Sequence, residues 1–319
     1  MSPKKDKHFA QGLQEALKSF SQLESRINEN DTPEQFKNML RHIITQLKLQ
    51  AEVPQSSSFS SMIMSDLSRL NIMPGGFFAM KDGYEDRARD LAVLEEEGEL
   101  WSSSNLYCHL SFLENHVARD NEAGARTWID AFLFWAAAML PRHKHFLLNM
   151  EYCVPEMTIA PGSAETLSGF LDCARVVSDR YLKSASLQEL KVMGLFGFFV
   201  TEAKYNKLGE NYITQAVCEM YTCAKNLQRK FIHGALSNGQ AWIFLFLTLN
   251  DGFNGATYKQ SDEIVVNLSW ASEGRTSVCA PQPDIIAAVL AHWIENSLAD
   301  LENDEWFYDP GASEQTGTR

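Results

Sequence analysis

Hydrophobic residues recur every three or four positions in two runs between residues 9 and 49. This is the period that places side chains on one face of an α-helix. The break between the runs, Asp31-Thr32-Pro33, has the residues of a helix cap and a first turn. The pattern therefore predicts a helical hairpin over 9–49, whose apolar faces would allow a homodimer. The serine-rich residues 50–61 are typical of a linker, and we assign residues 1–100 to a helical N-terminal region.

The pattern changes in the second part of the chain, where short apolar runs alternate with turn residues. A strongly apolar stretch at 124–140 predicts a buried helix. The pattern then predicts strands at 147–159, 167–177 and 193–204, a helix at 211–230, strands at 231–236, 240–248 and 263–268, and a helix at 283–303. This order predicts an α/β or α+β fold with a central mixed sheet flanked by helices. We place this domain at 101–308 and expect a flexible tail at 309–319.

The composition is that of a globular protein, with 45% hydrophobic and 22% charged residues. The longest apolar runs fall short of the ~20 residues that cross a membrane, and the first residues lack the apolar segment of a secretory signal. We therefore expect an intracellular protein, in the nucleus or the cytoplasm, without a membrane partner. The net charge of −13 argues against a protein coated with nucleic acid, because phosphates bind in a positive field.

The absence of several motifs narrows the function. The six cysteines have no C-x-x-C spacing, which gives no support to a zinc site. The sequence has no phosphate-binding GxxxxGK[ST] loop, no dinucleotide fingerprint after a strand, no HExxH pair and no GxSxG elbow. The sequence therefore gives little support to four classes of enzyme: phosphate-loop NTPases, dinucleotide oxidoreductases, zinc peptidases and typical serine hydrolases.

The most informative stretch is an apolar run that ends in Glu202-Ala203-Lys204. Side chains alternate along a strand, so Glu202 and Lys204 should point the same way and Ala203 the opposite way. An earlier apolar run ends in Asp172, which lies beside Glu202 if the two strands pair. Two converging carboxylates repel unless a cation joins them, and oxygen ligands select a hard ion such as Mg²⁺ or Mn²⁺. The alternative is a solvated strand face, since Glu-x-Lys alone is a weak motif.

The order of these motifs resembles the PD-(D/E)XK nuclease superfamily, which is restriction-endonuclease-like. Within it, the chain is similar to uncharacterised fungal and Crinkler-type nuclease domains, over roughly residues 145–300. Leu171 stands where the family usually has a proline before its aspartate. The residues that carry the resemblance are Glu156, Ser168, Gly169, Asp172, Glu202, Lys204, Gln215, Gly234, Asn238, Gly239, Trp242 and Phe244.

The resemblance implies a restriction-endonuclease-like fold and metal-dependent hydrolysis of phosphodiester bonds, in DNA more than in RNA. Residue by residue, it makes Asp172 and Glu202 ligands of Mg²⁺ or Mn²⁺, with the carbonyl oxygen of Ala203 as a third ligand. Lys204 would hold the attacking water and stabilise charge on phosphorus. Gln215 falls on the next helix, where members of the family often have a glutamine that faces the site, and we count it as catalytic.

Further charged residues are open to two interpretations. Glu219, one helical turn after Gln215, and Glu156 are either additional acidic site residues or solvated charges. Lys225, Arg229 and Lys230 form a basic cluster that either binds substrate or complements the end of a helix.

The acidic chain also contains a region of positive charge. Residues 204–233 hold five basic and two acidic residues, so nucleic acid could bind locally. The alternative function, from a different class, is a catalytically inactive module of the same fold. Such a module would act as a protein-interaction, nucleic-acid-binding or effector protein.

Overall fold

The computed structural model describes residues 55–93, 102–158, 165–193, 197–270 and 274–311, together with a few isolated residues between 16 and 44. The predicted hairpin and most of the predicted tail lie outside the described residues, so the homodimer stays a prediction. The chain divides into two compact units, residues 1–56 with 161–166 and residues 57–160 with 167–319. The features that follow concern the second unit, except that two strands begin within the first unit, at residues 55–56 and 165–166.

The second unit is built on a mixed sheet with the strand order β1-β5-β6-β7-β8-β9-β2, to which β4 adds beside β5 and β10 beside β8. The strands pair in parallel at β6–β7 and β2–β9 and antiparallel at β5–β6, β7–β8, β8–β9 and β8–β10. Their bounds are Gln55–Ser58 (β1), Ile72–Phe77 (β2), His145–Thr158 (β4), Glu165–Ser178 (β5), Gly197–Ala203 (β6), Phe231–Ser237 (β7), Ala241–Leu249 (β8), Ala256–Gln260 (β9) and Ile264–Val265 (β10). The predicted mixed sheet is confirmed.

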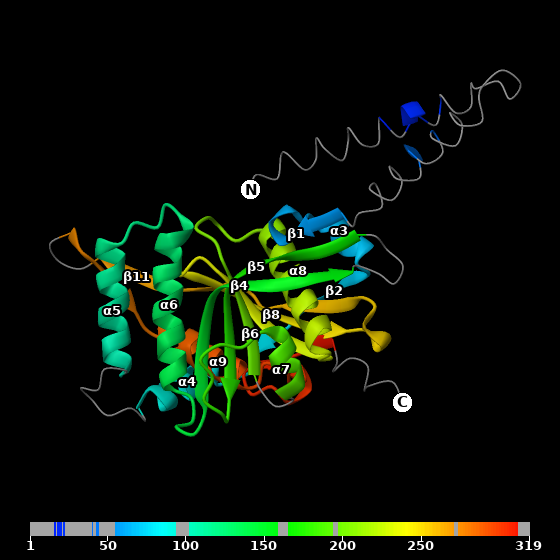
Figure 1. Cartoon of the computed structure of the whole chain (residues 1–319). Helices are drawn as coiled ribbons and strands as arrows, with labels where there is room; N and C mark the ends of the chain where they lie inside the picture. The colour runs from blue at the N-terminus through cyan, green and yellow to red at the C-terminus, as the bar shows by residue number, and fades with distance from the viewer. Residues whose placement is uncertain are drawn as a thin grey trace, which may run out of the picture. The chain divides into compact units, whose positions relative to one another are not determined.

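Helices cover both faces of the sheet. Phe198 and Val200 of β6 pack into one hydrophobic cluster with residues of α8, whereas Phe199 and Ala203 pack into another with residues of α6 and α9. Figure 1 shows α6 beside α5, which packs against it. None of the helices in the described ranges is long and apolar enough to cross a membrane. The helices are α3 (Met64–Arg69), α4 (Tyr84–Val93), α5 (Ser103–His116), α6 (Glu122–Ala138), α7 (Leu187–Met193), α8 (Glu210–Leu227) and α9 (Gln282–Glu295).

The remaining short elements lie outside the main sheet. Two small antiparallel sheets pair β11 with β12 and β3 with β13. The bounds are Ala79–Met80 (β3), Asn267–Trp270 (β11), Thr276–Cys279 (β12), Phe307–Tyr308 (β13), and Phe59–Ser61 (η1), Asp251–Phe253 (η2) and Leu301–Asn303 (η4) for the 3-10 turns.

A βαβ crossover determines where the ends of β6 and α8 lie. The chain leaves β6, returns along α8 and enters β7, which is parallel to β6 and paired with it. The first turns of α8 therefore follow the C-terminal end of β6, and its last turn precedes the start of β7. Gly234 of β7 permits this close packing, because a Cβ there would lie 2.7 Å from Met220 Sδ of α8. The glycine thus lets α8 lie directly on the sheet.

The N-terminal boundary differs from the expected one at residue 100. Strand β2 pairs with β9, so residues from 57 onward belong to the same unit as the sheet. Residues 55–61 form β1 and η1 instead of a linker, and Phe59 is buried. Its ring lies against Gly169, where a Cβ would approach it to 2.6 Å. This segment is held in place by main-chain strand pairing and by one buried aromatic ring. Neither of these produces a periodic hydrophobic pattern, so the serine-rich sequence did not predict the strand.

Candidate functional site

Glu202 lies at the C-terminal end of β6, and its side chain is 1% exposed. Its Oε1 accepts hydrogen bonds from the Lys204 ammonium and from Gln215 Nε2, the latter at 2.5 Å. The backbone N–H of Lys204 donates to the carbonyl of Ser237 on β7 at 2.8 Å. The prediction that Glu202 and Lys204 lie on the same side, with Ala203 in the opposite layer, is confirmed. The pair forms a buried ion pair and not a solvated strand face.

Asp172 reaches the same point from β5. Cys173 lies opposite Thr201 in the antiparallel β5–β6 pair, which brings Asp172 to the end of β6. Asp172 Oδ2 accepts a hydrogen bond from the backbone N–H of Ala203 at 2.8 Å. Its charge also raises the pKa of Glu202. The expected pairing of the two strands, and the proximity of their acidic residues, are therefore confirmed.

Helix α8 adds two polar side chains to this cluster. Gln215 donates to Glu219 Oε1 at 3.0 Å as well as to Glu202. Glu219 is completely buried, and Gln215 bridges its carboxyl group to that of Glu202. Of the two interpretations of Glu219, the structure therefore supports a place in the cluster and not on a solvated helix face.

Burial dominates the electrostatics of the cluster. Burial, with a further contribution from the charge of Asp172, raises the pKa of Glu202 to about 7 against the opposing effect of Lys204. Burial and the charge of Glu202 raise the pKa of Glu219 well above its usual value. Burial alone would lower the pKa of Lys204, but the carboxylate of Glu202 outweighs it and the pKa is raised. Lys204 is therefore a cation at neutral pH, and Glu219 keeps its proton to a higher pH than an exposed glutamate does.

Helix α6 contributes two residues that the sequence motifs do not include. Arg126 forms an ion pair with Asp172, and Arg126 Nη1 lies 3.5 Å from Glu151 Oε1. Glu122, one turn earlier, has its Oε1 at 3.5 Å from Lys204 Nζ. Two charges four residues apart at the start of a mostly apolar helix are the sequence signal that would have indicated them.

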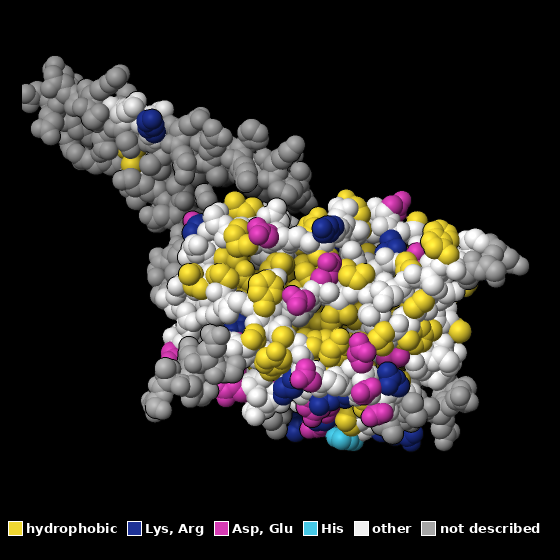
Figure 2. Space-filling view, turned by 180° about the vertical axis from the view of Figure 1, so that it is seen from behind, with side chains coloured by type: hydrophobic (Ala, Val, Ile, Leu, Met, Phe, Trp, Pro, Cys, Tyr) yellow, Lys and Arg dark blue, Asp and Glu magenta, His cyan; other side chains and the backbone are white. Residues whose placement is uncertain are grey.

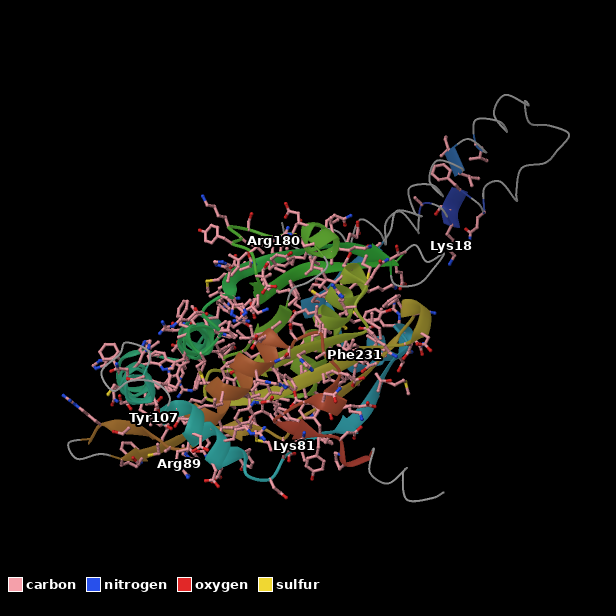
Figure 3. The ribbon with its side chains drawn as sticks, turned by 90° about the horizontal axis from the view of Figure 1, so that it is seen from below. Lys18, Lys81, Arg89, Tyr107, Arg180 and Phe231 are labelled. Carbon is pink, nitrogen blue, oxygen red and sulfur yellow. The ribbon has the colours of Figure 1, made fainter. Side chains whose placement is uncertain are left out.

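The other predicted residues lie elsewhere. Phe231, labelled in Figure 3, is the first residue of β7, and Arg229 and Lys230 directly precede it. Ala203 pairs with Ser237 at the opposite end of this seven-residue strand, which is about 20 Å away at the usual rise per residue. Arg229 and Lys230 therefore belong to the opposite end of the sheet from Glu202, because the crossover helix runs back along β6.

Lys225 and Glu156 are also separate from the cluster. Lys225 lies in the last turn of α8, where its Nζ contacts the Thr158 carbonyl at 3.4 Å and stands over the Tyr221 ring. Glu156 is exposed on β4, whereas Glu202 is buried. The basic residues thus fit the helix-end interpretation better than the substrate-binding one.

The donor atoms of the cluster suit a hard divalent cation. Oε2 of Glu202 and Oε2 of Glu219 are buried without a hydrogen-bond partner among the described residues. A cation would satisfy such oxygens, and carboxylate and carbonyl oxygens are the ligands that Mg²⁺ and Mn²⁺ prefer. Within the part of the chain that the structure describes, no group of three or more His, Cys, Asp or Glu side chains is arranged around a common metal position. Arg126 and Lys204 instead occupy oxygens of Asp172 and Glu202.

Comparison with known proteins adds no relative: no family model matches the chain, and no curated protein matches it significantly. The function is therefore inferred from the geometry of this cluster.

Proposed function

We propose that this chain is a metal-dependent nuclease that hydrolyses phosphodiester bonds, in DNA more than in RNA, at the C-terminal end of β6. The observation that supports the proposal most is the convergence of Asp172, Glu202, Lys204 and Gln215, which come from β5, β6 and α8. Buried ionisable groups are costly to keep, and their clustering with shifted pKa values is typical of functional sites.

Each residue has a role that follows from its contacts. Asp172, Glu202 and the carbonyl oxygen of Ala203 are the proposed ligands for Mg²⁺ or Mn²⁺. When bound, the cation supplies charge neutralisation at the phosphate and lowers the pKa of water. Gln215 orients the Glu202 carboxylate through its 2.5 Å hydrogen bond. Glu219, bridged to Glu202 by Gln215 and with its pKa raised by burial, limits the negative charge of the cluster when it is protonated.

Lys204 acts as a cation in this proposal. Its raised pKa keeps the ammonium protonated at neutral pH, so it cannot serve as a general base. It can hold the attacking water as a hydrogen-bond donor and stabilise the negative charge that develops on the phosphate oxygens. Its position between Glu202 and Glu122 keeps the ammonium at the site.

Contact with nucleic acid is local in this proposal. Acidic side chains are scattered among hydrophobic ones over the face shown in Figure 2, which offers no extended positive surface to a polyanion. The net charge of −13 also disfavours extended binding of a polyanion. We therefore expect binding that is weak without metal and that decreases as the salt concentration rises.

The experiment is a cleavage panel of single-stranded, double-stranded and branched DNA and RNA with Mg²⁺, Mn²⁺ or EDTA. The wild type should cleave at least one substrate only with metal, and Glu202→Gln should reduce that rate at least ~100-fold, since a carboxamide cannot replace an anionic ligand. Glu189→Gln is the matched control, because Glu189 caps a helix on the surface through Ser186. Wild-type activity in Glu202→Gln would refute the assignment.

A specific observation favours the second candidate, an inactive binding module of this fold. Asp172 and Glu202 already have cationic partners in Arg126 and Lys204, so the cluster is partly neutralised by the protein itself. If the folded wild type cleaves nothing in the panel and its melting temperature does not respond to Mn²⁺, this candidate replaces the nuclease.

A further inference from the structure

One face of α6 carries charged residues one helical turn apart, each opposite a residue of opposite charge on the sheet. Residues four apart in a helix share a face, so the three side chains form one row, which we call the α6 charge stripe. The two outer members are acidic and the middle one is basic. The stripe consists of Glu122, Arg126 and Asp130, and the residues opposite are Lys204, Asp172 and Arg175.

The three positions of the stripe differ in how their charges are held. Glu122 is 3.5 Å from Lys204 at the rim, and its side chain is 44% exposed. Asp130 and Arg175 act on each other's pKa in the interior, where Arg175 is completely buried. Arg126 lies between them, with its side chain 24% exposed against 14% for Asp172. The Arg126–Asp172 pair is therefore mostly buried, but it is still accessible to solvent.

Arg126 supplies Asp172 with the positive charge that a metal ligand would otherwise receive from a cation. Arg126 Nη2 donates to Asp172 Oδ1, while Oδ2 is occupied by the backbone N–H of Ala203. A guanidinium and a divalent cation at the same carboxylate repel each other, and the repulsion is strong where water is partly excluded. The mostly exposed Glu151, 3.5 Å from Arg126 Nη1, offers the guanidinium a second partner toward solvent.

We propose that Arg126 is a positioning residue that competes with the divalent cation for Asp172 and thereby sets the metal affinity of the site. The inference rests on the proposed metal site, but it concerns a residue that the nuclease motif does not contain. In the metal-free chain Arg126 holds Asp172 in place beside Ala203. Metal binding requires the guanidinium to move away from Oδ1. The loss of this ion pair opposes metal binding and lowers the affinity of the site for the cation.

Calorimetric titration of Mn²⁺ into the metal-free, full-length protein, without nucleic acid, tests this directly. Arg126→Gln should bind Mn²⁺ about 10-fold more tightly than the wild type, a difference of about 1.4 kcal/mol. Arg126→Lys, which keeps the charge but loses the planar donor pair, should bind severalfold more tightly than the wild type and less tightly than Arg126→Gln. Arg119→Gln is the matched control, because Arg119 forms its ion pair with Glu114 and not with Asp172 or Glu202, and the variant should leave the affinity unchanged.

The outcomes separate the two proposals. Equal or weaker Mn²⁺ binding by Arg126→Gln overturns the competition, even if the wild type is a metal-dependent nuclease. Tighter binding supports it, even if the cleavage panel shows no activity. If none of the proteins binds Mn²⁺, both the competition and the metal site are wrong. If Arg126→Gln does not fold, the comparison of the wild type with Arg126→Lys tests the proposal. Arg126→Lys must then bind Mn²⁺ severalfold more tightly than the wild type.

Discussion

Two regions of the second unit treat buried polar groups in opposite ways. On the α9 side, His233 of β7 stacks on Trp293 with ring centroids 4.4 Å apart, and burial, with the charge of His292, lowers its pKa to about 3. That histidine is neutral within an aromatic core. At the end of β6, by contrast, Glu202 and Lys204 are buried as an ion pair beside Asp172. The aromatic region keeps its buried histidine neutral, whereas the end of β6 brings several charged side chains together.

The difference supports the proposal that the end of β6 is the functional region. Replacing a buried ion pair by apolar residues of similar volume is often neutral or stabilising, so packing alone gives no reason to keep Glu202 and Lys204. The aromatic region needs no such explanation, since large rings such as Trp293 and Phe244 bury much apolar area. The comparison therefore supports a structural role for the aromatic region around Trp293 and the proposed chemical role for the end of β6.

The largest expected effect is that of breaking the buried pair. Lys204→Met should lower the free energy of unfolding by up to about 3–5 kcal/mol above pH 7, where Glu202 is ionised, because it leaves the buried carboxylate without its cation. Lys259→Met is the control, since Lys259 forms a more exposed pair with Asp309 and should cost about 1 kcal/mol or less. Urea unfolding measures both. An equal loss of unfolding free energy in the two variants would mean that the Glu202–Lys204 pair contributes no more to stability than a surface ion pair.

The second effect is a pH dependence that comes from Glu202. Its pKa rises from the ordinary 4.5 to about 7 on folding, so the folded chain binds the extra proton between these values and the stability falls as the pH rises. Glu202→Gln should remove that trend. Its stability relative to the wild type should increase by up to about 1.4 kcal/mol per pH unit from pH 4.5 to 7. Urea unfolding in EDTA at pH 5 and pH 7 is the measurement, and a constant difference would contradict the shift.

His233 should give the opposite trend, which sharpens the comparison. Its folded pKa is lowered from 6.5 to about 3, so the unfolded chain takes up the proton first and stability is lost as the pH falls through this interval. His233→Phe should therefore be most stabilising, relative to the wild type, at the acidic end. His116→Phe, at an exposed position, serves as the control in unfolding experiments at pH 4 and pH 7. A pH-independent difference between His233→Phe and the wild type would show that the ring is not held neutral.

The smallest effect is expected at the far end of α8. Lys230→Ala should change the unfolding free energy by no more than about 0.5–1 kcal/mol, because the residue is exposed and contributes one cation–π contact with Phe231. Its cleavage rate should equal that of the wild type, since Lys230 adjoins the opposite end of β7. A rate reduced 10-fold or more would mean that substrate extends along α8 to this end.

The sequence alone predicted the core of the site because the relevant patterns are local. Side-chain alternation places Glu202 and Lys204 together, and one strand pairing brings Asp172 to them. Arg126 could not be predicted in the same way, because its contact with Asp172 spans 46 residues and depends on how α6 packs on the sheet. The sequence also could not show at which end of the sheet Arg229 and Lys230 lie, because proximity in sequence to Gln215 does not show which end of a crossover helix faces the site. Their substrate-binding role stays a prediction.

The fold was predictable to a similar extent. The apolar runs that became β5 to β8 follow directly from hydrophobic patterning, and the mixed sheet follows from their order. The strands β1 and β2 were missed because their residues, such as the serines of β1 and Pro74-Gly75-Gly76 of β2, have low strand propensity. Pairing with neighbouring strands in the sheet overrides that propensity.

Metal binding is the central claim, and the melting temperature of the metal-free protein with increasing Mn²⁺ tests it most directly. A cation that binds only the folded state stabilises it by about 2.7 kcal/mol at 100 times its dissociation constant. The wild type and Asp179→Asn, which alters a surface ion pair with Lys144, should both show a rising melting temperature. Asp172→Asn should not respond. A wild-type melting temperature that stays constant up to millimolar Mn²⁺ would contradict the metal centre.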